Sequence, residues 1–200
     1  WVTAWEREAG NINQGKWHQG LPFLWEEEEF EDCLREFVAR TYAKIAAKNP
    51  GASHVLDKYP AYALHTATIR HFIPHARFIH VLRDGRDVVV SMLAARRNVG
   101  FGATNITSAA NEWLRMVEGA REASQYAGSY LEVRYEDVLD NPQVALKTLY
   151  EFCDLDASET MIAGIASDHD FAKMKARRQT ADPDTKAAEG HYWRGKSGNW

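Results

Sequence analysis

Apolar residues follow two spacings along the chain, one typical of helices and the other typical of strands. Between Glu26 and Lys48 they recur every three or four positions until Asn49-Pro50-Gly51 ends the pattern, which predicts a helix. Further helical patterns occupy the stretch that stops before Pro74 and residues 87–97, 108–125 and 141–155. Shorter apolar runs between these segments predict strands at residues 53–60, 77–83 and 129–138.

This alternation predicts an α/β fold in which helices flank a parallel β-sheet, because parallel strands need crossover connections. We expect residues 1–200 to form one domain, with an irregular segment at 1–25 before an α/β core at 26–200. In such sheets, ligands bind beyond the carboxyl ends of the strands. Three residues that can carry chemistry stand at or near such ends, namely Lys58, Arg83 and Tyr135.

Composition narrows the choice of ligand. The chain has a net charge of −4, which argues against a general nucleic-acid-binding role. Basic residues nevertheless gather at 70–97 and 173–196, so we expect a pocket for a small anion. No apolar run approaches the roughly 20 residues that span a bilayer, and we expect a cytoplasmic protein without a transmembrane segment. The two cysteines, Cys33 and Cys153, lack the spacing of a metal site.

The segment "RFIHVLRDGRDVVVS", residues 77–91, is the strongest candidate for an anion site. A strand ends there, the chain turns, and a helix begins near position 86 or 87. A helix N-terminus presents free backbone N–H groups, Arg83 adds a forked donor that suits a phosphate, and the Ser91 hydroxyl follows about one turn later. The alternatives are a salt bridge from Arg83 to Asp84 or Asp87 and an ordinary serine on the helix surface.

Two weaker candidates flank this segment, and a third can be dismissed. Lys58 ends the preceding predicted strand, although lysines at strand ends are often only solvated. The glycine-rich "WRGKSGNW" at 193–200 lets backbone amides approach an anion, or is simply a flexible basic loop. The segment "GNINQGK" at 10–16 imitates a phosphate-binding loop, but Trp17 occupies the hydroxyl position and no strand-loop-helix context surrounds it.

Five segments in the right order resemble the PAPS-dependent sulfotransferases over roughly residues 53–200. They are Lys58, "FIPHARFIHVLRDGRDVVVS", "LEVRYEDVLDNP", "FAKMK" and "WRGKSGNW". The resemblance implies a three-layer fold related to the P-loop nucleotide kinases. It also implies transfer of a sulfuryl group from 3′-phosphoadenosine 5′-phosphosulfate (PAPS) to a hydroxyl or amine, without a metal, leaving adenosine 3′,5′-bisphosphate (PAP).

The resemblance assigns the recognition of the nucleotide 3′-phosphate to two parts of the chain. Arg83 and Ser91 match the residues that hold this phosphate. Arg194 and Gly195 match a segment that closes over it, although Trp193 replaces the arginine that usually begins that segment.

The remaining matched residues contact the adenine or the transferring group. The resemblance implies that Tyr135 lies by the adenine, that Phe171 stacks near it, and that Lys58 reaches the sulfuryl group. Pro60 occupies the place where some relatives carry a catalytic histidine. The base is therefore unassigned, and His18 in the irregular segment is one candidate.

The sequence departs from the family at its N-terminus, because no 5′-phosphosulfate loop is recognisable. We therefore expect a sulfotransferase domain that is partial at both ends and lacks its first βα unit. Two rival functions are a nucleotide kinase, which needs a complete phosphate loop and carboxylates for magnesium, and a non-catalytic nucleotide-binding remnant. The acceptor cannot be read from the sequence, because the segments expected to set it, such as 1–30 and 98–108, carry no transferable pattern. Carbohydrate, small alcohol or phenol, lipid and peptide tyrosine stay open as acceptors, as does the oligomeric state.

Overall fold

The computed structural model describes residues 24–169, 173 and 198. The chain divides into two compact units. One contains the described residues up to Lys58 together with His71–Pro74, and the other contains Tyr59–Arg70 and the described residues from His75 onward. We describe each unit by itself, and the single domain expected over residues 1–200 stays a prediction.

The first unit is built on helix α3 (Glu27–Ala46), which confirms the long helix predicted from the sequence. Its first turn is acidic and its last turn contains Lys44, an arrangement that complements the helix dipole. Arg35 bonds to Asp32 at 2.7 Å and to Glu31 at 3.0 Å. These pairs lie on successive turns and stabilise the exposed face of α3.

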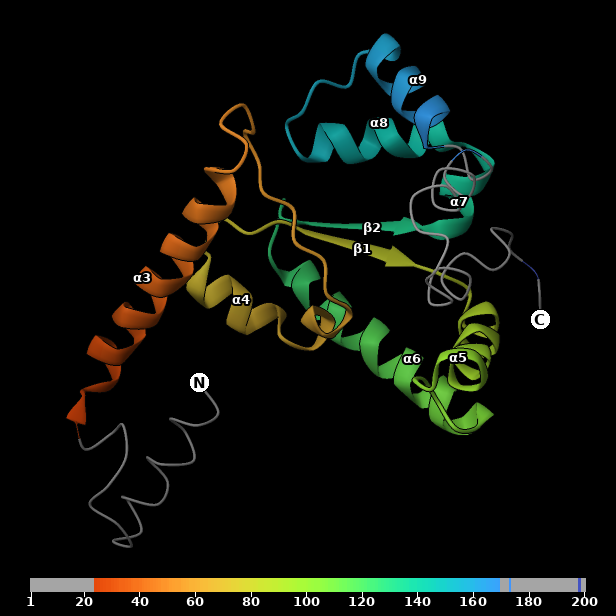
Figure 1. Ribbon diagram of the computed structural model, residues 1–200, viewed down its shortest axis with the longest axis horizontal. Helices are drawn as coiled ribbons and strands as arrows, with labels where there is room; N and C mark the ends of the chain where they lie inside the picture. Colours follow the sequence, from red (N-terminus) through yellow and green to blue (C-terminus); the bar gives the residue numbers. More distant parts are fainter. Residues whose placement is uncertain (1–23, 170–172, 174–197, 199–200) are drawn as a thin grey trace, which may run out of the picture. The chain divides into compact units, whose positions relative to one another are not determined.

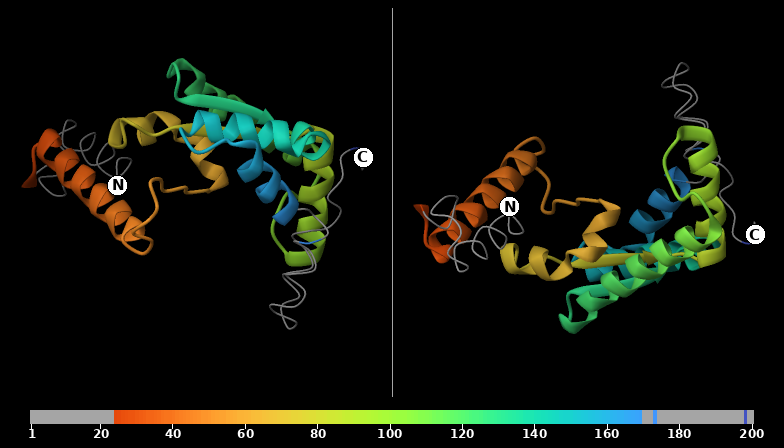
Figure 2. Two further views of the ribbon diagram at one scale, coloured as in Figure 1. Left: turned by 90° about the horizontal axis from the view of Figure 1, so that it is seen from above. Right: turned by 90° about the horizontal axis from the view of Figure 1, so that it is seen from below.

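The second unit contains a parallel pair of strands, β1 (Phe78–Leu82) and β2 (Tyr130–Arg134), with Phe78 opposite Tyr130 and Leu82 opposite Arg134. The chain crosses from β1 to β2 through three helical segments: α5 (Gly85–Val99), α6 (Ile106–Arg121) and the 3-10 turn η2 (Glu122–Gln125). Within the described residues, β2 is followed by α7 (Tyr135–Asp140), α8 (Pro142–Phe152) and α9 (Glu159–Asp168). Figures 1 and 2 show α6 and α8 on opposite sides of the strand pair, so the expected layered α/β fold is confirmed.

The strand predicted at residues 53–60 is wrong. Residues 54–59 have no regular secondary structure, and they lead into the 3-10 helix η1 (Pro60–Leu64) and then helix α4 (Thr66–Phe72). Leu56 is 85% exposed. A strand needs a hydrogen-bonded neighbour, and among the described residues only β1 and β2 pair with each other. The strand predicted at 129–138 is also shorter than expected, because Tyr135 already begins α7.

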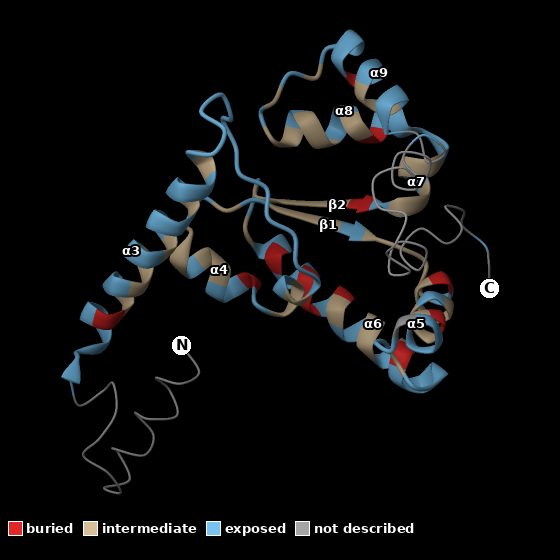
Figure 3. Ribbon diagram, viewed as in Figure 1, coloured by how far each residue is buried: buried red, intermediate tan, exposed pale blue. Residues whose placement is uncertain are grey.

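The core of the second unit surrounds α6 (Figure 3). This helix begins with a capping box formed by Asn105 and Ser108, which satisfies two of its exposed backbone donors. It buries Ala109, Val117 and Ala120. Small residues dominate this stripe, so neighbouring segments can approach α6 closely.

A polar cluster fastens the end of α6 to the sheet. Arg121 donates to both carboxylate oxygens of Glu132, from Nε at 2.8 Å and from Nη2 at 2.9 Å. The Tyr130 hydroxyl donates to Glu132 at 3.0 Å, and His80 Nδ1 lies 2.9 Å from that hydroxyl. The hydrogen bonds from Arg121 are the main reason why the pKa of Glu132 falls from 4.5 to about 2. The cluster therefore holds α6 against both strands through a charged carboxylate.

Candidate functional site

The junction of β1 and α5 forms a well-capped helix start. Asp84 is the N-cap residue, and its carboxylate accepts a hydrogen bond from the Arg86 backbone amide at 2.8 Å. The Arg86 side chain donates to the same carboxylate from Nε at 3.0 Å and from Nη2 at 2.6 Å. These hydrogen bonds hold the pKa of Asp84 at about 2. Arg86 is therefore bound into the cap of the helix.

Arg83 stands between β1 and this cap. Its guanidinium carbon lies 4.6 Å from the centre of the Tyr135 ring, and its Nη2 lies 3.9 Å from Asp87 Oδ2. The Arg83 carbonyl accepts a hydrogen bond from Trp113 Nε1 at 3.2 Å. The side chain is 30% exposed, so it is partly accessible from solvent. An arginine held in this way suits recognition of an oxyanion.

One face of α5 continues the site. The Asp87 side chain is only 1% exposed, and its Oδ2 accepts a hydrogen bond from the Gly198 backbone amide at 2.9 Å. Ser91 is exposed and stands four positions after Asp87, so the two residues share a helix face. The structure thus gathers Arg83, Asp87 and Gly198 into direct contacts, and it places Ser91 one turn further along α5.

Several residues that build this site are not among those predicted from the sequence. Trp113 Nε1 donates a hydrogen bond to the Arg83 carbonyl. Glu136 Oε1 accepts a hydrogen bond from the neighbouring Asp84 amide at 2.9 Å. Glu136 could have been found from the predicted parallel sheet, since adjacent strands bring their carboxyl ends together. Leu82 pairs with Arg134, and the residues that follow them meet. Gly198 lies 111 positions from Asp87, and no local pattern signals that contact.

The other predicted site residues either have roles that stay predictions or lie outside the described part of the chain. Lys58 belongs to the first unit, where it is exposed and lies outside regular secondary structure, and its role stays a prediction. Tyr135 lies against Arg83, and its contact with adenine also stays a prediction. Four predicted residues lie outside the described part of the chain: His18, Phe171, Arg194 and Gly195.

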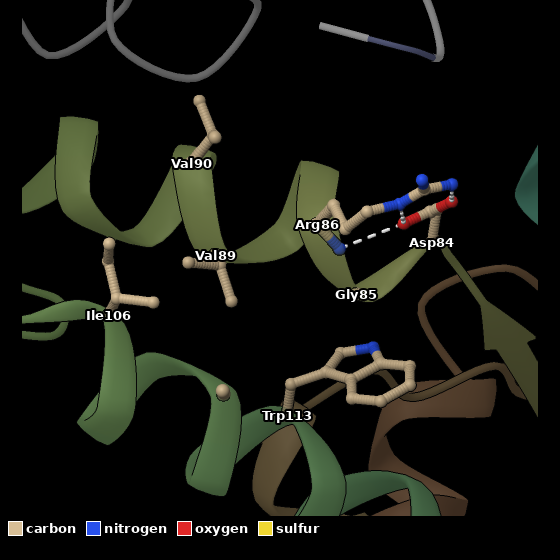
Figure 4. Close-up of a pocket in the computed structure, with 8 residues that line it drawn as sticks. Asp84, Gly85, Arg86, Val89, Val90, Ile106 and Trp113 are labelled. Atoms are coloured by element: carbon tan, nitrogen blue, oxygen red, sulfur yellow. Dashed lines mark hydrogen bonds and ion pairs between the residues drawn. The ribbon is translucent and has the colours of Figure 1, made fainter. Parts of the chain in front are cut away.

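A pocket of about 550 Å³ lies between α5 and α6. Figure 4 shows Val89 on α5 facing Ile106 and Trp113 on α6, with the bonded Asp84 and Arg86 side chains at one end. Neither Arg83 nor Ser91 lines it. The pocket is therefore an apolar feature separate from the face that carries Arg83 and Asp87.

The described residues contain neither a metal-binding cluster nor a membrane-spanning helix. No group of three or more His, Cys, Asp or Glu side chains in this part of the chain could hold a metal ion. Within the same residues, every helix is too short or too polar to cross a membrane.

Comparison with known proteins identifies the family. The sequence model of the sulfotransferase family matches residues 4–159. A Caenorhabditis elegans protein named "Putative protein-tyrosine sulfotransferase" is 28% identical over 138 residues, which are 68% of this chain and 52% of that protein. Protein-tyrosine sulfotransferase 1 of Danio rerio is 28% identical over 114 residues, 56% of this chain and 32% of that protein.

A solved structure resembles the fold. The crystal structure of mouse sulfotransferase SULT7A1 complexed with PAP matches with a TM-score of 0.52 and 21% sequence identity, and the match covers 66% of this chain and 54% of that one. The chain spans about half the length of the C. elegans relative. Because the family model matches more than half of the chain, the chain belongs to the sulfotransferase family.

Proposed function

We propose that the chain is a sulfotransferase domain that transfers the sulfuryl group of PAPS to an acceptor hydroxyl or amine, and that it binds the product PAP at the same site. Family membership supports this function. The observation that carries it is the arrangement of Arg83 at the carboxyl end of β1, beside the Tyr135 ring and the Asp87 carboxylate. This is the strand edge where α/β sheets bind ligands.

The residues present fit the 3′-phosphate of the nucleotide. Arg83 offers a fork of N–H donors whose guanidinium is stacked on Tyr135, and Ser91 offers an exposed hydroxyl on the same face of α5 as Asp87. An Arg–phosphate pair is charge-assisted and directional. We assign these two residues to 3′-phosphate recognition, and we add Arg194 and Gly195 on the basis of the sequence resemblance alone.

We assign the residues that contact the adenine and the transferring group from the sequence resemblance alone. Tyr135 and Phe171 would border the adenine, and Lys58 would stabilise negative charge on the transferring oxygens. When bound, PAPS supplies an activated sulfuryl group. Catalysis then depends on residues that hold donor and acceptor in line and stabilise the charge, as in phosphoryl transfer. His18 is a candidate to accept the acceptor's proton.

Among the acceptors left open by the sequence, the relatives favour a peptide tyrosine. Two Caenorhabditis proteins and one from Danio rerio carry names that specify protein-tyrosine sulfotransferases. A phenol oxygen would form the new S–O bond while the bond from sulfur to the 5′-phosphate oxygen breaks. Its proton would pass to the base. The cytoplasmic location and the absence of a metal requirement remain predictions.

The test is a transfer assay with sulfur-labelled PAPS. The acceptors are a tyrosine-containing peptide, the same peptide with its tyrosine replaced by phenylalanine, a phenol and a sugar. Each acceptor is assayed with and without EDTA. We expect label on the tyrosine peptide but not on its phenylalanine copy, with equal rates in EDTA. Transfer of phosphate from ATP that stops in EDTA would support the kinase alternative. Binding of PAP without transfer to any acceptor would support the non-catalytic alternative.

A further inference from the structure

We propose that Asp87 is a positioning residue of the anion site: its buried carboxylate orients the Arg83 guanidinium and fixes the Gly198 backbone amide beside it. The inference rests on the proposed function, because it assumes that Arg83 recognises the nucleotide 3′-phosphate. Asp87 itself does not contact the phosphate in this account.

Asp87 departs from the ordinary role of an acid at its position. Asp84 is the N-cap, so Asp87 is the third residue of α5. An acidic side chain there commonly reaches back to the N-cap amide. That amide instead donates to Glu136 Oε1 at 2.9 Å, whereas Asp87 Oδ2 accepts from Gly198 at 2.9 Å. The Asp87 carboxylate therefore bonds α5 to a distant part of the chain, at Gly198.

Burial makes the Asp87 carboxylate dependent on its partners. A carboxylate that is 1% exposed loses its hydration and is costly unless other groups replace it. Arg83 Nη2 and the Gly198 amide both approach the same oxygen, at 3.9 Å and 2.9 Å. The single Gly198 N–H is used by Asp87 itself, and the two nitrogens that face the carboxylate lie less than about 7 Å apart. Asp87 thus holds the chain at Gly198 close to the Arg83 guanidinium.

Two contacts restrict the orientation of Arg83. Its guanidinium has the Tyr135 ring at 4.6 Å and the Asp87 carboxylate at 3.9 Å. Contacts of this kind restrict the rotamers of a long side chain, so less ordering is required when the anion binds. Without Asp87, Arg83 would keep its charge but lose one of these constraints.

A purely electrostatic role predicts the opposite result, which makes the proposal testable. A carboxylate close to an anion site repels the anion, so its removal should strengthen binding if charge were its main effect. If Asp87 only stabilised the helix dipole, its removal should lower stability and leave nucleotide selectivity unchanged. Only a positioning role predicts weaker and less selective binding.

The experiment is isothermal calorimetry with PAP and with adenosine 5′-monophosphate (AMP), which lacks the 3′-phosphate. We compare the wild type with Asp87→Ala, Asp87→Asn and Glu118→Ala, the last removing an exposed carboxylate from α6. We expect Asp87→Ala to weaken PAP binding about tenfold and to leave AMP binding unchanged. Asp87→Asn keeps an oxygen acceptor but not the charge, and we expect a smaller loss of PAP selectivity. Glu118→Ala should change neither affinity.

A second readout does not depend on the nucleotide. In the protein without nucleotide, the Gly198 amide should exchange with solvent at least about tenfold faster in Asp87→Ala than in the wild type. Asp87→Asn should retain most of the protection, because its amide oxygen can accept the same hydrogen bond.

The outcomes separate this inference from the proposed function. If the wild type prefers PAP but Asp87→Ala binds it equally or more tightly, the positioning role is wrong and the proposed function stands. If the wild type does not prefer PAP to AMP, both are wrong. Should thermal unfolding show that Asp87→Ala does not fold, the Asp87→Asn result decides: reduced PAP selectivity supports the inference, and unchanged selectivity overturns it.

Discussion

Replacing Gly119 by alanine should destabilise the second unit, although alanine is normally favourable in a helix. Gly119 is buried in α6. A Cβ atom there would lie 2.6 Å from the Ala63 carbonyl oxygen and 3.1 Å from Leu64 Cδ2. The first distance is far below van der Waals contact and involves backbone, so α6 and η1 would have to separate.

The size of the effect follows from two opposing contributions. Overpacking at a well-packed site costs about 1–3 kcal/mol, and contact with a rigid backbone oxygen favours the upper end. The higher helix propensity of alanine offsets this cost by about 1 kcal/mol. We therefore expect Gly119→Ala to lower the free energy of unfolding by about 2 kcal/mol. Because α6 also carries Trp113, which binds the Arg83 carbonyl, binding of PAP should weaken as well.

Urea denaturation measures this change, and Gly164→Ala in α9 is its matched control. Gly164 is exposed, and a Cβ atom there meets nothing within 4 Å. That substitution should raise the free energy of unfolding by up to about 1 kcal/mol. If Gly119→Ala were as stabilising as Gly164→Ala, with the same m value, the close approach of α6 and η1 would be wrong.

The remaining predictions concern pH, the Arg83 contacts and metal. The pKa of Glu132 is lowered from 4.5 to about 2 in the folded protein. As the pH falls, the unfolded state therefore binds a proton at Glu132 before the folded state does. Urea titrations should therefore show stability falling between pH 4.5 and about 2, less steeply in Arg121→Ala. Burial lowers the pKa of His80 below its ordinary 6.5, so stability should also begin to fall below pH 6.5, and His80→Gln should remove that component; an unchanged profile would contradict it. Tyr135→Leu should weaken PAP binding in calorimetry about three- to tenfold by removing the ring beside Arg83, whereas equal affinity would show that the ring is dispensable. Sulfuryl transfer should proceed at the same rate with EDTA, and full inhibition would exclude the metal-free mechanism.

The central part of the fold could be predicted from the sequence because its signals are local. The apolar run before Arg83 and the turn residues after it predict β1 and the start of α5, and the structure has both. The segment at 53–60 shows the limit of such signals. Its apolar residues suit a strand, but strand formation depends on a hydrogen-bonded neighbour, which composition cannot supply.

The same distinction applies to the candidate site. Arg83 and Ser91 could be proposed because a helix N-terminus and its spacing can be read locally. Tyr135 could be expected near Arg83, because it follows the neighbouring strand of the predicted parallel sheet. The contact of Asp87 with Gly198 could not, since it joins residues 111 positions apart. A buried aspartate in a helix resembles an ordinary N-terminal acid until its distant partner is known.

Calorimetry of the wild type and Arg83→Ala with PAP and AMP tests the central claim most directly. Arg97→Ala, which removes an exposed arginine near the other end of α5, is the matched control, and thermal unfolding must first show that all three proteins fold. We predict that the wild type binds PAP more tightly than AMP. Arg83→Ala should lose about tenfold or more in PAP affinity without losing AMP affinity, and Arg97→Ala should resemble the wild type. Equal binding of PAP and AMP by the wild type, or an unchanged preference in Arg83→Ala, would contradict recognition of the 3′-phosphate by Arg83.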